Sequence, residues 1–163
     1  MIHTDLAGLR VLVVEDNPLQ RRILIKILET LRAQEVRQAA DGSEALAILS
    51  SFLPDIILTN WQMRPMAGLE FARRVRASER QPFQIVPIIM LSANGDHGQA
   101  GRARDAGINA FITKPVSPLQ LGAKVVEVIA NPRPFIRSAT YVGPDRRFRD
   151  VAFSGSDRRR TDT

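Results

Sequence analysis

Apolar and polar residues alternate along the first 130 positions in a pattern that predicts five strands and five helices. Short apolar runs such as 11–14 are typical of strands that are buried on both faces of a parallel sheet. Between these runs, apolar residues recur at intervals of three and four, as they do in amphipathic helices. We expect strands at 11–14, 36–40, 56–58, 86–91 and 110–113, and helices near 18–31, 44–49, 68–80, 97–106 and 119–130.

The regular alternation of strands and helices predicts a doubly wound α/β fold. Right-handed crossovers place helices on both faces of such a parallel sheet, and ligands bind beyond the carboxyl ends of its strands. The residues at those ends include two carboxylates, an amide, a hydroxyl and an ammonium: Glu15, Asp16, Asn60, Ser92 and Lys114. We therefore expect these five side chains to converge on one site.

The adjacent acids Glu15 and Asp16 have two interpretations. An acidic pair in a loop is most often a solvated turn, but two carboxylates also suit Mg²⁺, which takes few protein oxygens and keeps several waters. Lys114 could neutralise an anion beside them, and Ser92 could donate its hydroxyl to a phosphoryl oxygen. These partners favour the metal site.

The pattern stops after Ala130, where two prolines in residues 131–134 end the last helix and form a stiff spacer. We expect a leader at 1–9, one domain at 10–131 and an irregular, arginine-rich tail at 132–163. The tail holds eight arginines and four aspartates, which leaves fifteen basic and thirteen acidic residues in 1–130. Most of the net charge of +6 therefore belongs to the tail.

Composition excludes several classes of protein. The chain has no cysteine, so disulfide scaffolds and thiolate metal sites are excluded. No apolar run approaches the roughly 18 residues of a membrane span, and the first residues lack the pattern of a secretion signal. We expect a soluble, cytoplasmic protein that does not insert into membranes.

Five segments follow one another at characteristic spacing: VLVVEDN at 11–17, PDIIL at 54–58, MAGLE at 66–70, PIIMLSA at 87–93 and AFITKP at 110–115. Together they resemble the response-regulator receiver family, in its single-domain form that is similar to chemotaxis regulators. The resemblance covers roughly 9–130 and implies a flavodoxin-like receiver fold with five parallel strands in the order 2-1-3-4-5.

The resemblance also implies roles for individual residues. Asp16 would bind Mg²⁺ directly, Glu15 through water, and Gln62 through its backbone carbonyl. Ser92 and Lys114 would contact the phosphoryl group, with a cis peptide after Lys114.

Phe111 falls where the family keeps an aromatic residue that switches rotamer. Plain packing on the last strand is the alternative role, and both can hold because the switch is itself a choice between two packed positions.

Position 60 departs from the family, because Asn60 stands where the family has the aspartate that accepts phosphate and helps to bind the metal. An amide is a poor nucleophile and lacks the charge that holds Mg²⁺, so we expect no phosphotransfer to this chain. Two explanations remain open. A natural pseudo-receiver would be free to lose the other site residues, whereas an engineered Asp→Asn change would leave them intact, as they are here. The following loop also departs from the family, because its proline is displaced to Arg64-Pro65.

The tail repeats a Gly-x-Asp-Arg-Arg unit, at 143–147 and at 155–159. Arginine forms bidentate contacts with phosphate and with guanine edges, and aromatic rings stack on nucleobases. The tail resembles the arginine-rich extensions of receiver-like proteins that bind cyclic di-GMP and act on the flagellar motor. This resemblance makes Arg146, Arg147, Arg158 and Arg159, with Tyr141 or Phe148 as a stacking ring, candidates for binding that two-fold ligand. The alternatives are a docking tail for a protein, a solubilising extension, or a nucleic-acid contact, and the last is disfavoured because no reader motif fits in the tail.

We therefore expect a response regulator of a two-component phosphorelay that acts by binding partners and is not an enzyme. Its partners would be a histidine kinase or phosphotransfer protein, a downstream protein target and, through the face of the last two helices, a second copy of the chain. The rival hypothesis is a phosphorylation-independent adaptor whose tail alone acts as sensor. A dehalogenase-like enzyme of similar topology would need an Asp-x-Asp motif after the first strand, which residues 15–18 do not supply.

Overall fold

The computed structural model describes residues 5–79, 83–93, 97–138 and 140–145, with the side chains of 97–100 excepted. Five strands form one parallel sheet in the order β2-β1-β3-β4-β5, as predicted. The strands are β1 (Arg10–Val14), β2 (Glu35–Ala39), β3 (Ile56–Asn60), β4 (Ile88–Ser92) and β5 (Ala110–Thr113). The helices are α1 (Pro18–Thr30), α2 (Gly42–Leu49), α3 (Gly68–Ala77), the short 3₁₀ turn η1 (Phe83–Ile85), α4 (His97–Asp105) and α5 (Pro118–Ala130).

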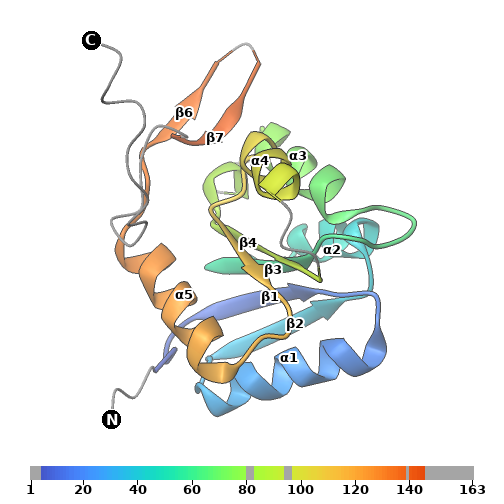
Figure 1. The fold of residues 1–163 in the computed structure, drawn as a ribbon, viewed down its shortest axis with the longest axis vertical. Coiled ribbons are helices and arrows are strands. Elements are labelled where there is room, and N and C mark those ends of the chain that lie inside the picture. The colour runs from blue at the N-terminus through green and yellow to red at the C-terminus, as the bar shows by residue number, and fades with distance from the viewer. Residues whose placement is uncertain (1–4, 80–82, 94–96, 139, 146–163) are drawn as a thin grey trace.

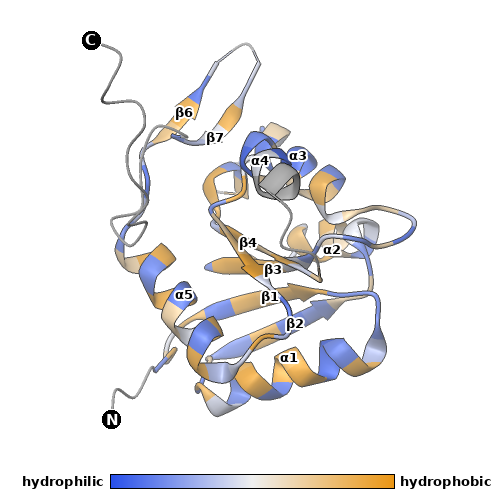
Figure 2. Cartoon of the chain, viewed as in Figure 1, coloured by the Kyte–Doolittle hydropathy of each residue, from blue (hydrophilic) through white to orange (hydrophobic). Residues whose placement is uncertain are grey.

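Side chains of the central strands alternate between two apolar cores, one on each face of the sheet. Along β1, Leu12 and Val14 face the core under α2 and α3, whereas Val11 and Val13 face the core under α1 and α5. The same alternation continues along β3 and β4, so both faces of these strands are buried. Figure 2 shows these strands as apolar along most of their length, which is the pattern the sequence analysis used.

Side-chain caps fix where three of the helices begin. Asn17 Oδ1 accepts a hydrogen bond from Gln20 N at 3.0 Å, which is the predicted cap at the start of α1. Asp41 caps α2 by accepting from Ser43 N and Glu44 N, and Ser117 caps α5 by accepting from Gln120 N at 3.1 Å. Because only three residues separate the end of β1 from the start of α1, the Asn17 cap holds the acidic segment of residues 15–16 at the edge of the sheet.

The chain before β1 also packs on the domain, because Leu6 is fully buried and its backbone N–H donates to Leu31 O. In the part of the chain that the structure describes, no helix combines the length and the apolar character needed to cross a membrane.

The segment after α5 was expected to be irregular, but its first part forms an antiparallel hairpin of β6 (Phe135–Arg137) and β7 (Val142–Pro144). Pro132 and Pro134 were predicted to end the last helix and to form a stiff spacer, and α5 does end at Ala130. Pro134 lies just before β6 and Pro144 at the end of β7, where a missing N–H is tolerated. The hairpin lies at one end of the molecule, above α3 and α4 in Figure 1.

Candidate functional site

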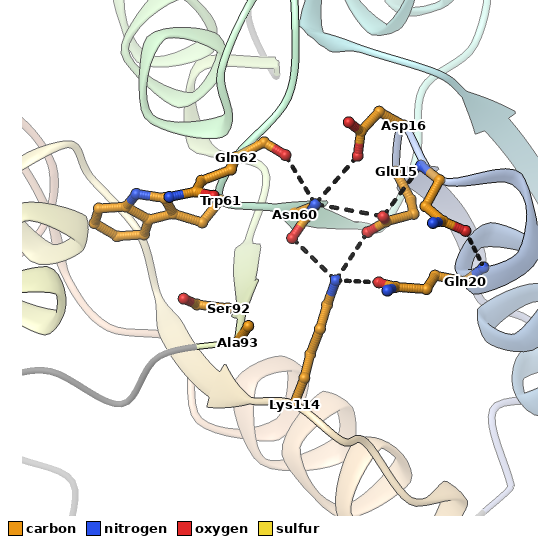
Figure 3. A pocket seen from close by; sticks show the side chains of 10 residues that line it. Glu15, Asp16, Gln20, Asn60, Trp61, Gln62, Ser92, Ala93 and Lys114 are labelled. Atoms are coloured by element: carbon orange, nitrogen blue, oxygen red, sulfur yellow. Dashed lines mark hydrogen bonds and ion pairs between the residues drawn. The ribbon is translucent and has the colours of Figure 1, made fainter.

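A polar pocket of about 260 Å³ lies at the carboxyl ends of β1, β3, β4 and β5. This is the edge of the sheet where the sequence analysis placed the site, because parallel strands all end on the same side. The pocket is lined by Glu15, Asp16, Asn17, Gln20, Asn60, Trp61, Gln62, Ser92, Ala93 and Lys114. Figure 3 shows Asn60 at its centre, with the acidic residues on one side and Trp61 and Ser92 on the other.

Glu15 is the buried acid of the pair, with 1% of its surface exposed, whereas Asp16 is exposed. Burial raises the pKa of the Glu15 carboxyl, and the neighbouring Lys114 ammonium acts in the opposite direction. Glu15 Oε2 and Lys114 Nζ lie 3.1 Å apart as an ion pair. The Arg21 guanidinium also donates to the backbone oxygen of Glu15 at 2.8 Å, which fixes the end of β1.

Asn60 is the last residue of β3, and its amide connects the acidic and basic sides of the pocket. The amide nitrogen donates to Gln62 O at 2.9 Å, to Glu15 Oε1 at 3.3 Å and to Asp16 Oδ1 at 3.4 Å. The amide oxygen accepts from Lys114 Nζ at 3.0 Å. The Lys114 ammonium on one side and the three oxygen acceptors on the other fix which way the amide points. Asn60 therefore donates hydrogen bonds to the three other predicted metal ligands, Glu15, Asp16 and Gln62.

The backbone of Asn60 is held by the start of α3. Gly68 lies against it so closely that a Cβ on Gly68 would collide with Asn60 O. The N–H of Gly68 donates to Trp61 O at 3.0 Å, and Trp61 N–H donates to Leu91 O at 2.9 Å. Glycine at position 68 therefore allows the loop of residues 61–67 to close over the end of the sheet.

Lys114 reaches the pocket from the end of β5 and donates to three oxygens. Besides Glu15 and Asn60, it contacts Gln20 Oε1 at 2.6 Å. Gln20 was not among the predicted site residues. It lies three residues after the cap Asn17, on the first turn of α1, and this position beside the carboxyl end of β1 could have indicated that it lines the pocket. The peptide between Lys114 and Pro115 is cis, as expected, and so is the one between Arg64 and Pro65.

Ser92 is buried at the end of β4 and lines the pocket, and its backbone oxygen accepts from Lys114 N at 2.7 Å. Phe111 does not line the pocket. Its ring packs edge-on against the Trp61 ring, with centroids 6.1 Å apart and planes at 83°. Phe111 is therefore one contact removed from the pocket.

The structure brings together six of the predicted site residues, namely Glu15, Asp16, Asn60, Gln62, Ser92 and Lys114. Tyr141 lies elsewhere, and the expectation that its ring is free to stack on a base was wrong for this conformation. Its side chain is 6% exposed and its hydroxyl donates to Pro144 O at 2.6 Å, because the ring fills the space between the hairpin and the domain. Arg146, Arg147, Arg158 and Arg159 lie outside the described residues.

The oxygen atoms around the Asn60 amide nitrogen suit a hard cation. They comprise carboxylate oxygens of Glu15 and Asp16 and the carbonyl of Gln62, which is the oxygen-only donor set that Mg²⁺ prefers. Within the described residues, no group of three or more His, Cys, Asp or Glu side chains gathers in a way that could hold a metal.

Comparison with known proteins gives consistent matches over the sheet and its helices. Residues 11–126 match the response regulator receiver domain family. The chemotaxis protein CheY of Pseudomonas aeruginosa is 32% identical over 120 residues, which are 74% of this chain and 95% of the relative. A CheY homologue of Campylobacter jejuni is 34% identical over 122 residues, which are 74% of this chain and 92% of the relative.

Two solved structures have similar folds. A response regulator from Chloroflexus aurantiacus, described as putative, superposes with a TM-score of 0.70 at 30% identity and covers 76% of this chain and 98% of its own. The receiver domain of a sensor histidine kinase from Pseudomonas aeruginosa superposes with a TM-score of 0.69 at 30% identity, covering 77% and 100%. That structure holds a magnesium ion coordinated in its active-site cleft.

Proposed function

The chain belongs to the response regulator receiver domain family, and from that membership we propose that it signals by binding partners without accepting a phosphoryl group at position 60. Receiver domains of this family work in two-component systems with histidine kinases or phosphotransfer proteins and with downstream targets. Asn60 is the observation that carries the proposal. Its amide stands at the end of β3, between the acidic residues and Lys114.

An amide in this position cannot do the chemistry of a carboxylate. The nucleophile in acyl-phosphate formation is a carboxylate oxygen, and the amide nitrogen has no free lone pair to attack phosphorus. Its N–H groups already donate to Glu15, Asp16 and Gln62, and its oxygen accepts from Lys114. The pocket therefore has a complete hydrogen-bond network around a neutral side chain, which supports a site that is stable without phosphorylation.

Mg²⁺ remains compatible with the residues of the pocket. Asp16, Glu15 and the Gln62 carbonyl would hold it, and the bound ion would supply positive charge to an anion in the pocket. Asn60 contributes no charge to this set, and its N–H groups use the same oxygens as hydrogen-bond acceptors. We therefore propose that the chain binds Mg²⁺ weakly.

Phosphorylation by acetyl phosphate with Mg²⁺ tests the proposal. We expect Asn60→Asp to acquire an acyl phosphate that intact-mass measurement detects, and the parent chain to acquire none. Asn17→Asp is the matched control, because it adds a carboxylate to the same pocket away from the end of β3 and keeps the helix cap. A phosphorylated product trapped on the parent chain would overturn this proposal.

A second candidate function concerns the tail and rests on its doubled Gly-x-Asp-Arg-Arg unit. In this proposal Arg146, Arg147, Arg158 and Arg159 bind cyclic di-GMP, with arginine forks on phosphates or guanine edges and aspartate on the guanine N1/N2 edge. Because Tyr141 is buried, Phe148 is the aromatic residue beside the first unit that would stack on a base. The alternative is that the tail docks a protein partner or nucleic acid.

Calorimetric titration separates these ligands. We expect the full chain to bind cyclic di-GMP in preference to GTP and cyclic di-AMP, and a chain truncated after Asp145 to lose this binding. Arg→Lys changes at the four arginines should also abolish it, because lysine keeps the charge and not the planar fork. Arg102→Lys on the exposed side of α4 is the control and should have no effect. Absence of heat with cyclic di-GMP would favour a protein partner, and equal, salt-sensitive binding to random oligonucleotides would favour nucleic acid.

A further inference from the structure

Arg76 is a charged residue in the interior of the domain, with 2% of its surface exposed. Its guanidinium donates to Gly107 O at 2.9 Å, Gln84 O at 3.0 Å, Val86 O at 2.6 Å and Asn109 Oδ1 at 2.9 Å. Each of these acceptors is an uncharged oxygen, so the cation is solvated by dipoles. Burial lowers the pKa of Arg76 to about 10, and the group therefore stays protonated at neutral pH.

The guanidinium and its acceptors come from three separate parts of the chain. Arg76 lies near the end of α3, Gln84 and Val86 lie in and just after η1, and Gly107 and Asn109 lie between α4 and β5. Gln84 also returns a bond, since its side-chain amide donates to Arg76 O at 3.0 Å. The guanidinium thus ties together the loops at the amino ends of β4 and β5, the end of the sheet opposite the acidic pocket.

The hairpin of β6 and β7 covers this cation on its remaining side. The Phe135 ring lies over the guanidinium, with its centroid 5.3 Å from Arg76 Cζ, within the range of a cation–π contact. Tyr141 is buried in the same region and contributes an electrostatic interaction that favours the charged form of Arg76. A desolvated cation is costly unless its whole surface is satisfied, so an aromatic cover suits it.

Two glycines let the hairpin come into direct contact with the domain. Gly107 has a φ of +89°, and a Cβ there would meet Arg76 Cγ at 2.8 Å and Val142 O at 3.0 Å. A Cβ on Gly143 would meet Gly107 Cα at 2.8 Å and the Tyr141 hydroxyl at 2.6 Å. The two backbones therefore pack against each other with no space for a side chain on either.

We propose that residues 134–138 and 140–145 are a strap, an addition to the receiver domain that folds onto it by covering Arg76 and packing Gly143 on Gly107. The strap lies beyond residue 126, where the match to the receiver family ends. It starts after α5 on one face of the sheet and reaches α3 and η1 on the other, passing the amino end of β5 (Figure 1). The last strand of the strap, β7, packs against α3 and η1, at the end of the sheet opposite the acidic pocket.

Tryptic cleavage of the full chain after Arg137 tests the strap. In the docked hairpin this bond is protected, because Arg137 pairs with Val142 and Ser138 N–H donates to Tyr141 O at 2.7 Å. We expect Gly143→Ala to accelerate cleavage at this bond by at least about tenfold, since proteolysis follows the population of the opened form. Gly101→Ala is the matched control, because a Cβ there has no atom within 4 Å, and it should leave the rate unchanged. Equal rates in the parent, Gly143→Ala and Gly101→Ala would overturn the proposal.

Two further readouts separate release of the strap from loss of the fold. Trp61 lies at the opposite end of the sheet, so we expect its fluorescence spectrum in Gly143→Ala to coincide with its spectrum in the parent chain. Phe135→Leu keeps an apolar side chain but removes the ring over Arg76, and like Gly143→Ala it should raise the rate of cleavage after Arg137. Should Gly143→Ala fail to fold, the cleavage rate of Phe135→Leu becomes the test. A rate equal to that of the parent would then contradict the proposal.

Discussion

At the scale of single residues, the neutral Asn60 amide and the buried Glu15 carboxylate decide how the pocket responds to ions. The Glu15 carboxylate loses most of its contact with water. The ion pair with the Lys114 ammonium at 3.1 Å and the hydrogen bond from the Asn60 N–H partly replace that lost hydration. Burial is the dominant influence, since the pKa of Glu15 is raised despite this ion pair. The charged form of Glu15 is therefore less favourable in the folded state than in the unfolded chain.

This shift in pKa predicts a pH dependence of stability. A carboxyl group with a raised pKa in the folded state contributes stability that is fully present below its unfolded pKa, near 4.5, and is lost as pH rises through the folded value. Glu15→Gln is neutral throughout, so we expect its stability relative to the parent to increase between pH 4.5 and pH 7. Urea unfolding at the two pH values in the presence of EDTA measures this. A stability difference that does not vary with pH would contradict it.

Restoring a carboxylate at position 60 should strengthen metal binding. Asn60→Asp removes the N–H groups that donate to Glu15 and Asp16 and adds a charged ligand. We expect the affinity for Mg²⁺ to rise by at least about tenfold. Trp61 lines the pocket and is the only tryptophan, so its fluorescence reports the titration. Asp55→Asn, at the other end of β3, is the control, and equal affinities in Asn60→Asp and the parent would place the cation elsewhere.

At the scale of elements, the junction between β3 and α3 carries the most restrictive geometry near the pocket. Helix α3 can begin at Gly68 only because that residue has no side chain to collide with Asn60 O. The helix has no side-chain cap at Ala67, and backbone contacts such as that from Gly68 N–H to Trp61 O hold its start in place. The loop that carries the Gln62 carbonyl therefore depends on close backbone approach.

Gly68→Ala tests this dependence. The added Cβ would have to displace the Asn60 backbone, and we expect a loss of roughly 1–3 kcal/mol in the free energy of unfolding, as for other overpacked sites. Gly101→Ala adds the same methyl to a helix with open space around it and should be neutral or stabilising by up to about 1 kcal/mol. Chemical denaturation of both variants gives the comparison. A Gly68→Ala variant as stable as the parent would show that the junction can relax.

At the scale of the whole molecule, the acidic pocket and the hairpin lie at opposite ends of the sheet. The pocket lies at the carboxyl ends of the strands, whereas the hairpin packs near the amino ends of β4 and β5. No residue that lines the pocket belongs to the described part of the hairpin.

Binding by the tail should consequently be independent of position 60. We expect cyclic di-GMP to bind the parent and Asn60→Asp with the same affinity, within about a factor of two, in calorimetry without phosphate donors. Adding Mg²⁺ and acetyl phosphate to Asn60→Asp then asks whether phosphorylation changes that affinity. A difference between the unphosphorylated forms would indicate that the two ends are coupled through the sheet.

The sheet, its helices and the position of the pocket follow from the amino-acid sequence alone. Apolar runs and helical spacing are local patterns, and parallel strands bring their carboxyl ends to one edge, so these patterns suffice to place Glu15, Asp16, Asn60, Ser92 and Lys114 together. The contact of Gln20 with Lys114, and the direction in which the Asn60 amide points its nitrogen, follow only from the folded arrangement. Side-chain direction depends on neighbours distant in sequence, and local patterns do not contain them.

The hairpin was also decided by tertiary structure. Residues 132–145 have no strand period, and the end of the apolar pattern after Ala130 predicted an irregular tail. The segment becomes ordered because a buried guanidinium on α3 needs cover and because Gly107 and Gly143 leave room for two backbones to touch. Arg76 shares α3 with two exposed arginines, Arg73 and Arg74, and a lone arginine is rarely buried. Its burial follows from acceptors on η1 and before β5, which come together only when the chain is folded.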